Sequence, residues 1–178
     1  MPAPTISVPG EWTFLYGMWN VHHRSLVARL AGSDEWQEFE GTSEFWPLLA
    51  GAGNVDDNFI DLPGDPYRAV SLRSFDPATG LWSIWWLDGR RPGVIDVPVV
   101  GRFEDGIGRF EAHDTFNGRP IRVRFLWTRT DTLTPRWEQA FSDDGGLTWE
   151  TNWEMDFTPA TSRRRSSTAG GPVTRSGR

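Results

Sequence analysis

The chain has 178 residues, 24 acidic residues against 18 basic ones and a net charge of −6, which suits one domain with a sizeable core. It contains no Cys and no Lys, which excludes thiolate nucleophiles, disulfides, iron–sulfur clusters, Schiff-base enzymes and P-loop lysines. Its 11 Trp and 11 Phe against 2 Tyr form a large aromatic surface, which favours an apolar or planar ligand.

Composition also separates a folded domain from a C-terminal tail and indicates the cellular compartment. Residues 162–178 contain five Arg, no acidic residue and one apolar side chain larger than Ala, which predicts a disordered tail after a single domain at residues 1–161. That domain carries 13 Arg and 24 acidic residues, a net charge of about −11, which argues against nucleic acid as a partner. The N-terminus lacks a signal-peptide pattern and no run of 18 apolar residues occurs. We therefore expect a cytoplasmic protein that does not enter a membrane.

Apolar and polar residues alternate with a period of two along the domain, and no apolar stripe has helical length. The pattern predicts about ten strands, near residues 17–30, 35–46, 54–61, 67–75, 81–88, 95–104, 107–115, 120–130, 134–142 and 147–157. Short turns join them, which is typical of an antiparallel up-and-down meander. Closure into a barrel removes both sheet edges and leaves a lumen for one small ligand. Residues 14–17 are expected to form a turn or helical plug at one barrel end.

A Gly-x-Trp motif, Gly17-Met18-Trp19, opens the first strand. Together with the segments FLYGMWNVHHRSL, WQEFEGT, GNVDDN, FDPATGLWSIWWLD and TWETNWEMDFT, it resembles an uncharacterised bacterial family of lipocalin-like (calycin-type) β-barrels over residues 11–158. The resemblance implies the fold and no general activity. Such barrels often end the last strand with an Arg that packs over the Trp indole. Here Phe157-Thr158 runs into Pro159, so we expect the barrel floor to be closed differently.

The first strand supplies the candidate acid/base. If Trp19 faces the lumen, His23 does too, and His22 faces outward, so the two cannot share a metal ion. With a pKa near neutrality, His23 would serve as a general acid/base or as a ligand hydrogen-bond group. A hydrogen-bonded core His without chemistry is the alternative.

Arg73 shares a strand face with small and apolar residues, so an inward guanidinium needs a partner. The expected partners are Glu38, Glu44, Asp57, Asp61 and Asp114. The pair would either hold a carbonyl or carboxylate ligand at the pocket base or lie at the barrel rim. The acidic cluster Asp56, Asp57 and Asp61 is either a cation site or, more simply, a polar strand end.

Strand phase predicts further lumen residues. The last strand places Trp149, Thr151, Trp153, Met155 and Phe157 inward and Glu150, Asn152, Glu154 and Asp156 outward. Gln139 is expected to be a buried amide, and Arg122 and Arg124 to lie outside. Strand 81–88 is ambiguous, because Trp82, Ile84 and Trp86 compete with Trp85 and Leu87 for the inner face. Its outer face could contact a second subunit, so the protein is a monomer or a homodimer.

One further motif, Ser142-x-Asp144-x-Gly146-x-Thr148-Trp149, matches the Asp-box of sialidase propellers. It occurs once and not at a propeller period. In this motif the carboxylate and hydroxyls hold a tight hairpin. We therefore expect a structural hairpin here and no sialidase activity.

These patterns predict a non-catalytic carrier or sensor that binds a small hydrophobic or aromatic molecule in the lumen. The expected ligand-binding residues are Trp19, Trp46, Arg73, Trp86, Trp137, Gln139 and Trp153. The alternative is a cofactor-independent cyclase, isomerase or lyase that uses His23 or a carboxylate. A third class is an interaction module that uses the Trp85 face. We expect no metal and no cofactor; haem on His23 or His113 is a minor option.

Overall fold

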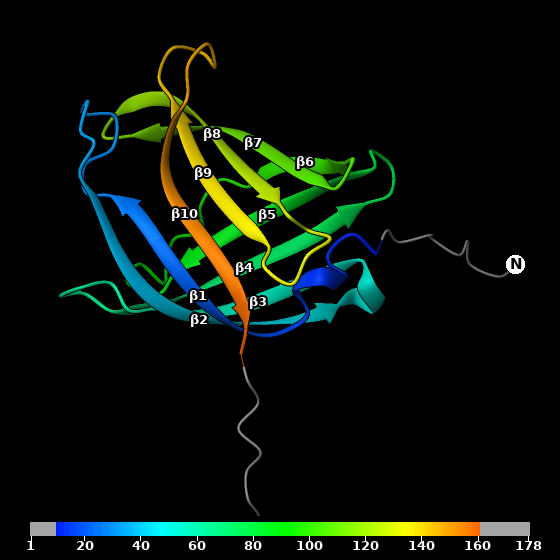
Figure 1. Cartoon of the computed structure of the whole chain (residues 1–178). Coiled ribbons are helices and arrows are strands. Elements are labelled where there is room, and N and C mark those ends of the chain that lie inside the picture. The colour runs from blue at the N-terminus through cyan, green and yellow to red at the C-terminus, as the bar shows by residue number, and fades with distance from the viewer. Residues whose placement is uncertain (1–9, 161–178) are drawn as a thin grey trace, which may run out of the picture.

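The computed structural model describes residues 10–160, which form a closed antiparallel β-barrel of ten strands with two short 3₁₀ helices (Figure 1). The elements are η1 (Thr13–Leu15), β1 (Gly17–Leu26), β2 (Trp36–Leu48), η2 (Leu49–Gly51), β3 (Gly53–Ile60), β4 (Tyr67–Asp76), β5 (Leu81–Asp88), β6 (Val99–Glu104), β7 (Ile107–Phe116), β8 (Arg119–Thr128), β9 (Arg136–Ser142) and β10 (Glu150–Pro159). The predicted strands and fold class are confirmed. The predicted disordered tail lies outside the described residues.

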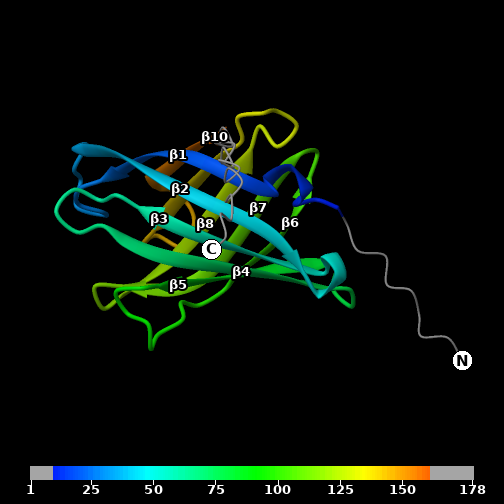
Figure 2. The same ribbon diagram turned by 90° about the horizontal axis from the view of Figure 1, so that it is seen from below.

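Each strand pairs with its neighbour in sequence, and the barrel closes where β1 pairs with β10. Figure 2 shows the strands wrapping around one continuous wall. In the closing register, Val21 lies opposite Phe157 and His23 lies opposite Met155. Because β1 pairs with β10, neither the first nor the last strand has a free edge, which removes the usual route to edge-to-edge association.

An aromatic plug closes one end of the barrel, as expected for the segment before β1. Trp12, which directly precedes η1, and Leu15, the last residue of η1, are fully buried. The Trp12 ring packs against the rings of Trp82, Phe103, Phe110 and Trp127. The indole N–H of Trp19 donates to the Leu15 carbonyl at 2.7 Å, and its ring meets Phe157 edge-on. Phe157 and the plug thus pack against the Trp19 indole, and the barrel floor is closed without an Arg at the end of β10.

Strand phase is as expected in most of the barrel, with one exception in β10. A register shift between Thr151 and Trp153 places two successive residues, Asn152 and Trp153, inside. Asn152 is fully buried and accepts a hydrogen bond from the Gln139 side chain at 2.9 Å. The prediction of an outward Asn152 and inward Thr151 and Trp149 is therefore wrong, because a β-bulge shifts the alternation by one residue.

The ambiguity in β5 is resolved. Trp82 and Ile84 are buried inside, and Trp85 lies on the outer face. Trp85 is in register with Leu72, Leu72 with Val55, and Val55 with Trp46. These four side chains form an apolar row on the outside of β2–β5.

The Asp-box is a structural hairpin, as expected. Asp144 accepts hydrogen bonds from Ser142, from the Leu147 and Thr148 amides and from the Thr148 hydroxyl. These bonds hold the pKa of Asp144 well below its usual range. Its Trp149 lies against Arg124, with the guanidinium 4.3 Å from the ring centroid.

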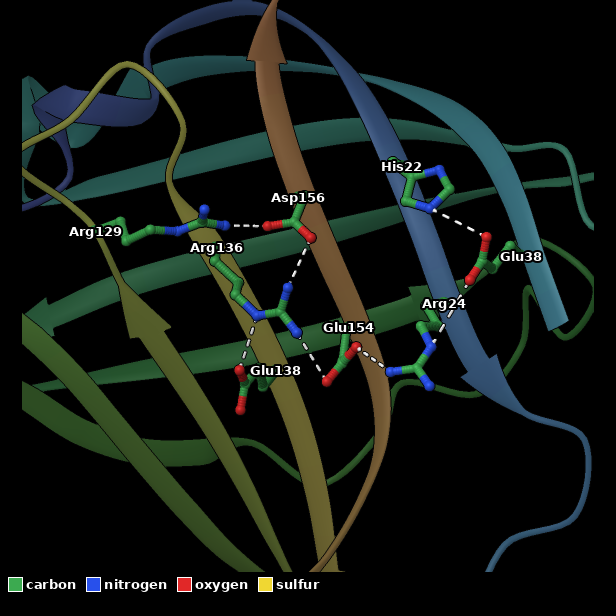
Figure 3. A network of polar contacts seen from close by, with 8 residues as sticks. All are labelled: His22, Arg24, Glu38, Arg129, Arg136, Glu138, Glu154 and Asp156. Carbon is green, nitrogen blue, oxygen red and sulfur yellow. Dashed lines mark hydrogen bonds and ion pairs between the residues drawn. The ribbon is translucent and has the colours of Figure 1, made fainter. Parts of the chain in front are cut away.

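A network of charged side chains crosses the β1–β10 seam on the outer wall (Figure 3). Arg136 of β9 contacts carboxylates on three residues, Glu138, Glu154 and Asp156, at 2.6–2.8 Å. Glu154 also contacts Arg24 of β1 at 3.2 Å. Since these groups bridge neighbouring strands and are paired with one another, we assign them a role in holding the barrel closed.

Candidate functional site

The barrel interior contains a cavity with one polar side and one aromatic side. The polar side comes from β3 and β4 and comprises Asp56, Asn58, Ser71 and Arg73. The rest of the wall is apolar and comprises Phe45, Ile84, Trp86, Phe125, Trp127, Trp137, Met155 and Phe157. The cavity volume is about 30 Å³, which is room for about two water molecules.

A buried ion pair forms the centre of the polar side. Nη2 of Arg73 lies 2.7 Å from Oδ2 of Asp56, and both side chains are at most 3% exposed. The inward Arg73 is thus as expected, but its partner is none of the five acids proposed and the pair does not lie at the rim. Asp56 and Arg73 reach each other because β3 and β4 are neighbours and both residues face inward.

Further hydrogen bonds fix the carboxylate and the guanidinium in place. Oδ1 of Asp56 accepts from the Asn58 amide at 2.6 Å and from the Ser71 backbone N–H at 2.9 Å. Nη1 of Arg73 donates to the Asn54 side-chain oxygen at 3.1 Å. The guanidinium also lies 4.7 Å from the centroid of the plug residue Trp12. The acceptors of Asp56 are therefore engaged, and the ion pair is rigidly held.

Two N–H donors on the cavity wall are unused. Nε of Arg73 and Nε1 of Trp127 are fully buried, and neither has a hydrogen-bond partner within residues 10–160. We call these two groups the open donors. A buried donor without a partner costs about 1–3 kcal/mol, so an acceptor that reached either group would remove that cost.

Trp86 and Phe125 differ from the rest of the wall because they are partly exposed, whereas the other wall residues are buried. Trp86 leans edge-on against Trp153, and Phe125 lies edge-on against Trp137. These contacts place them between the cavity and the end of the barrel opposite the plug. Trp86 and Phe125 are therefore the side chains that separate the cavity from solvent.

Arginines cover the aromatic end of the lumen opposite the plug. The Arg29 guanidinium lies 5.6 Å from the Phe141 centroid and 5.7 Å from the Trp153 centroid. Arg90 lies 3.6 Å from the Tyr67 centroid and is held by the carboxylate of Asp88 at 2.7 Å. Neither residue was predicted in this role from the sequence, since Arg90 lies in a loop without strand phase and β1 ends at Leu26, before Arg29, instead of continuing to residue 30.

His23 is buried inside the barrel but does not line the cavity. Its Nδ1 accepts a hydrogen bond from the Trp153 indole at 3.2 Å, which leaves the proton of the neutral ring on Nε2. Burial, with a smaller contribution from His22, lowers the pKa of His23 to about 3. The expected pKa near neutrality is therefore wrong, because no carboxylate compensates the desolvation.

The absence of a side chain at Gly41 makes room for the His23 ring. A Cβ on residue 41 would lie 2.7 Å from Nε2 of His23 and 2.5 Å from the Phe59 carbonyl oxygen. The ring of His23 also stacks on Phe39 at 4.9 Å. These contacts are those of a neutral core side chain held in one orientation.

The predicted ligand-binding residues fall into three groups. On the cavity wall lie Arg73, Trp86 and Trp137. Inside the barrel, but outside the wall of this cavity, lie Trp19, Gln139 and Trp153. Trp46 lies on the outer face and is 40% exposed, so its expected place in the lumen is wrong.

Sequence reasoning left three contributors out of the site. Trp127 was not among the expected ligand-binding residues, and Asp56 was assigned to an acidic cluster. That cluster is divided, because Asp56 faces inward and Asp57 pairs with Arg68 outside. The third contributor is Trp12, which precedes the first strand, where no alternation signals its burial.

Within the described range, no group of three or more His, Asp or Glu side chains is suited to a metal ion.

The fold and the cavity define a closed ten-stranded antiparallel barrel, consistent with a lipocalin-like fold, whose lumen joins a buried ion pair to an aromatic wall. No family model matches the chain, and no curated protein matches its sequence. No helix in the described part of the chain has the length and apolar character that a membrane crossing requires.

Proposed function

We propose that this protein is a non-catalytic carrier or sensor that binds one small, largely apolar or aromatic molecule in the barrel lumen. The observation that carries the proposal is the mixed wall of the cavity, with aromatic rings on one side and the open donors beside a fixed ion pair. Small-molecule sites combine a mostly apolar wall with a few placed polar groups in this way.

The size of the cavity constrains how such a ligand binds. A cavity that holds a benzene ring has a volume of about 150 Å³, against about 30 Å³ here. A ring-sized ligand therefore enters only when a wall side chain moves. Trp86 and Phe125 are the wall residues in contact with solvent, so we propose that binding displaces one of them.

The geometry favours binding over catalysis. Asp56 is the one carboxylate on the cavity wall in residues 10–160, and its oxygens are occupied by Arg73, Asn58 and Ser71. His23 lies off the wall, and a pKa of about 3 makes it a weak base at neutral pH. Neither group is available to move a proton of a bound substrate.

Replacing Trp86 by Ala tests the lumen as the binding site. We expect the variant to bind indole at least about tenfold more tightly than the wild type in calorimetric titration, because removing the wall side chain provides ring-sized space. Its free energy of unfolding should fall by about 2 kcal/mol, less than for a fully buried Trp.

Trp46→Ala is the matched control, since it removes the same side chain from the outer face of β2. We expect it to leave both indole affinity and stability close to wild type. Absence of indole binding in the wild type and in Trp86→Ala would contradict the proposed function. An equal gain in affinity in both variants would place the binding site outside the lumen.

A further inference from the structure

The size of the lumen limits how large a ligand is, whereas the open donors indicate which polar group the ligand carries. The Arg73 guanidinium carries its five N–H groups on three nitrogen atoms, of which Nη1 donates to Asn54 at 3.1 Å and Nη2 donates to Asp56 at 2.7 Å. The remaining Nε–H has no partner in the described chain, and neither has Nε1–H of Trp127. Both residues line the same cavity. Both N–H groups are shielded from solvent in the described structure, so a ligand meets these donors where it displaces the wall, and no acceptor within residues 10–160 competes for them.

The charge of the guanidinium is already balanced. Asp56 lies against Arg73 with both side chains almost completely buried. Among the described residues, Arg73 and Asp56 are the charged groups on the cavity wall, so the wall is neutral as a whole. A carboxylate ligand would add a net negative charge to this low-dielectric interior, next to Asp56, and desolvation would oppose its entry.

We infer that the lumen selects a neutral ligand that carries a carbonyl oxygen beside its apolar body, and that it discriminates against the corresponding carboxylate. The inference rests on the proposed function and specifies its ligand class. The carbonyl oxygen has two lone pairs and accepts from Nε–H of Arg73, from Nε1–H of Trp127, or from both. The apolar body contacts the rings of Trp86 and Trp137.

Three probes of similar size separate the possibilities. Acetophenone carries a ring and a neutral carbonyl, ethylbenzene carries the ring without an acceptor, and benzoate carries it with a charge. We expect the full-length protein at pH 7.5 to bind acetophenone about tenfold more tightly than ethylbenzene, since one or two hydrogen bonds to buried donors are worth about that factor. Benzoate should bind at least about tenfold more weakly than acetophenone.

Trp127→Phe removes one open donor and keeps an aromatic ring on the wall. We expect it to reduce the preference for acetophenone over ethylbenzene about threefold to tenfold, because one donor is lost. Any space gained from the smaller ring acts on both probes alike, so the ratio of the two affinities reports the donor. Trp12→Phe is the matched control. Its Nε1–H is also buried and has no partner in residues 10–160, but Trp12 does not line the cavity. The control should keep the wild-type preference.

Each of the other possible results of these titrations contradicts one named part of the proposal. Equal binding of acetophenone and ethylbenzene would contradict the inference and leave the proposed function standing, with the open donors serving ordered water only. Tightest binding of benzoate would show that the ion pair does not neutralise the site. Failure of all three probes to bind would contradict the proposed function and this inference with it. An equal loss of preference in Trp12→Phe would remove Trp127 from ligand recognition.

Discussion

Replacing Asp56 by Asn is expected to lower the free energy of unfolding by about 3–5 kcal/mol, the cost typical of leaving one partner of a buried ion pair alone. The Asn side chain has nearly the same shape, so packing is preserved and the loss reports the uncompensated Arg73 charge. Urea unfolding at pH 7, followed by Trp fluorescence, measures it.

The neighbouring Asp57→Asn is the matched control for this prediction. Asp57 pairs with Arg68 on the outer face, where the two side chains are 38% and 61% exposed, and such a pair contributes at most about 1 kcal/mol. Equal losses in the two variants would contradict the special role of the buried pair.

A double variant separates the charge from the shape of the site. In Asp56→Asn with Arg73→Met, the Asn oxygen can still accept from the Ser71 backbone N–H, and no buried charge remains. We expect this double variant to be more stable than Asp56→Asn alone, because replacing both partners removes the desolvation cost. A double variant as unstable as the single one would show that packing, and not charge, dominates at this site.

The inward position of Arg73 follows from the sequence, but its partner does not. A period of two places Tyr67, Ala69, Ser71 and Arg73 on one face, and burial of that face is then enough to require a counter-charge. The partner depends on the register between β3 and β4, in which Arg73 lies opposite Asn54 and Asp56 lies opposite Ser71. The ion pair is therefore diagonal, and one sequence carries no information on that offset.

Two errors of placement have different physical origins. Trp46 continues the outward series Glu40, Thr42 and Glu44 in β2, so the alternation already indicates an outer position that its hydrophobicity obscures. Asn152 is different, because the bulge beside it breaks the alternation, and bulges depend on pairing with a neighbouring strand. The first error is correctable from the sequence, whereas the second requires the structure.

The cavity itself was the least predictable feature. Strand number indicates a lumen wide enough for side chains and one small ligand, yet most of this space is filled by the plug and by Trp, Phe and Met side chains. How much space remains depends on rotamers and on ring-against-ring packing. The open donors are equally invisible in the sequence, since they follow from which bonds the neighbours fail to supply.

His23 gives the second large effect, an acid-dependent loss of stability. As pH falls through about 6.5, the His of the unfolded chain takes up a proton, whereas the folded His23, with a pKa of about 3, stays neutral. The unfolded state then binds more protons, so stability is complete above about pH 6.5 and falls by up to about 1.4 kcal/mol per pH unit down to about pH 3. Between pH 7 and pH 5 we expect His23 to lower the free energy of unfolding by about 2 kcal/mol.

Urea unfolding of wild type and His23→Gln at pH 7, 6 and 5 tests this origin. Gln can still accept from the Trp153 indole but does not titrate, so we expect the variant to lose most of the slope over this range. His113→Gln, which changes an exposed His on the outer face of β7, should keep it. If His23→Gln retains the wild-type slope, acid sensitivity arises elsewhere. His23 would then have to be protonated in the folded barrel, and its exclusion from acid–base chemistry would no longer hold.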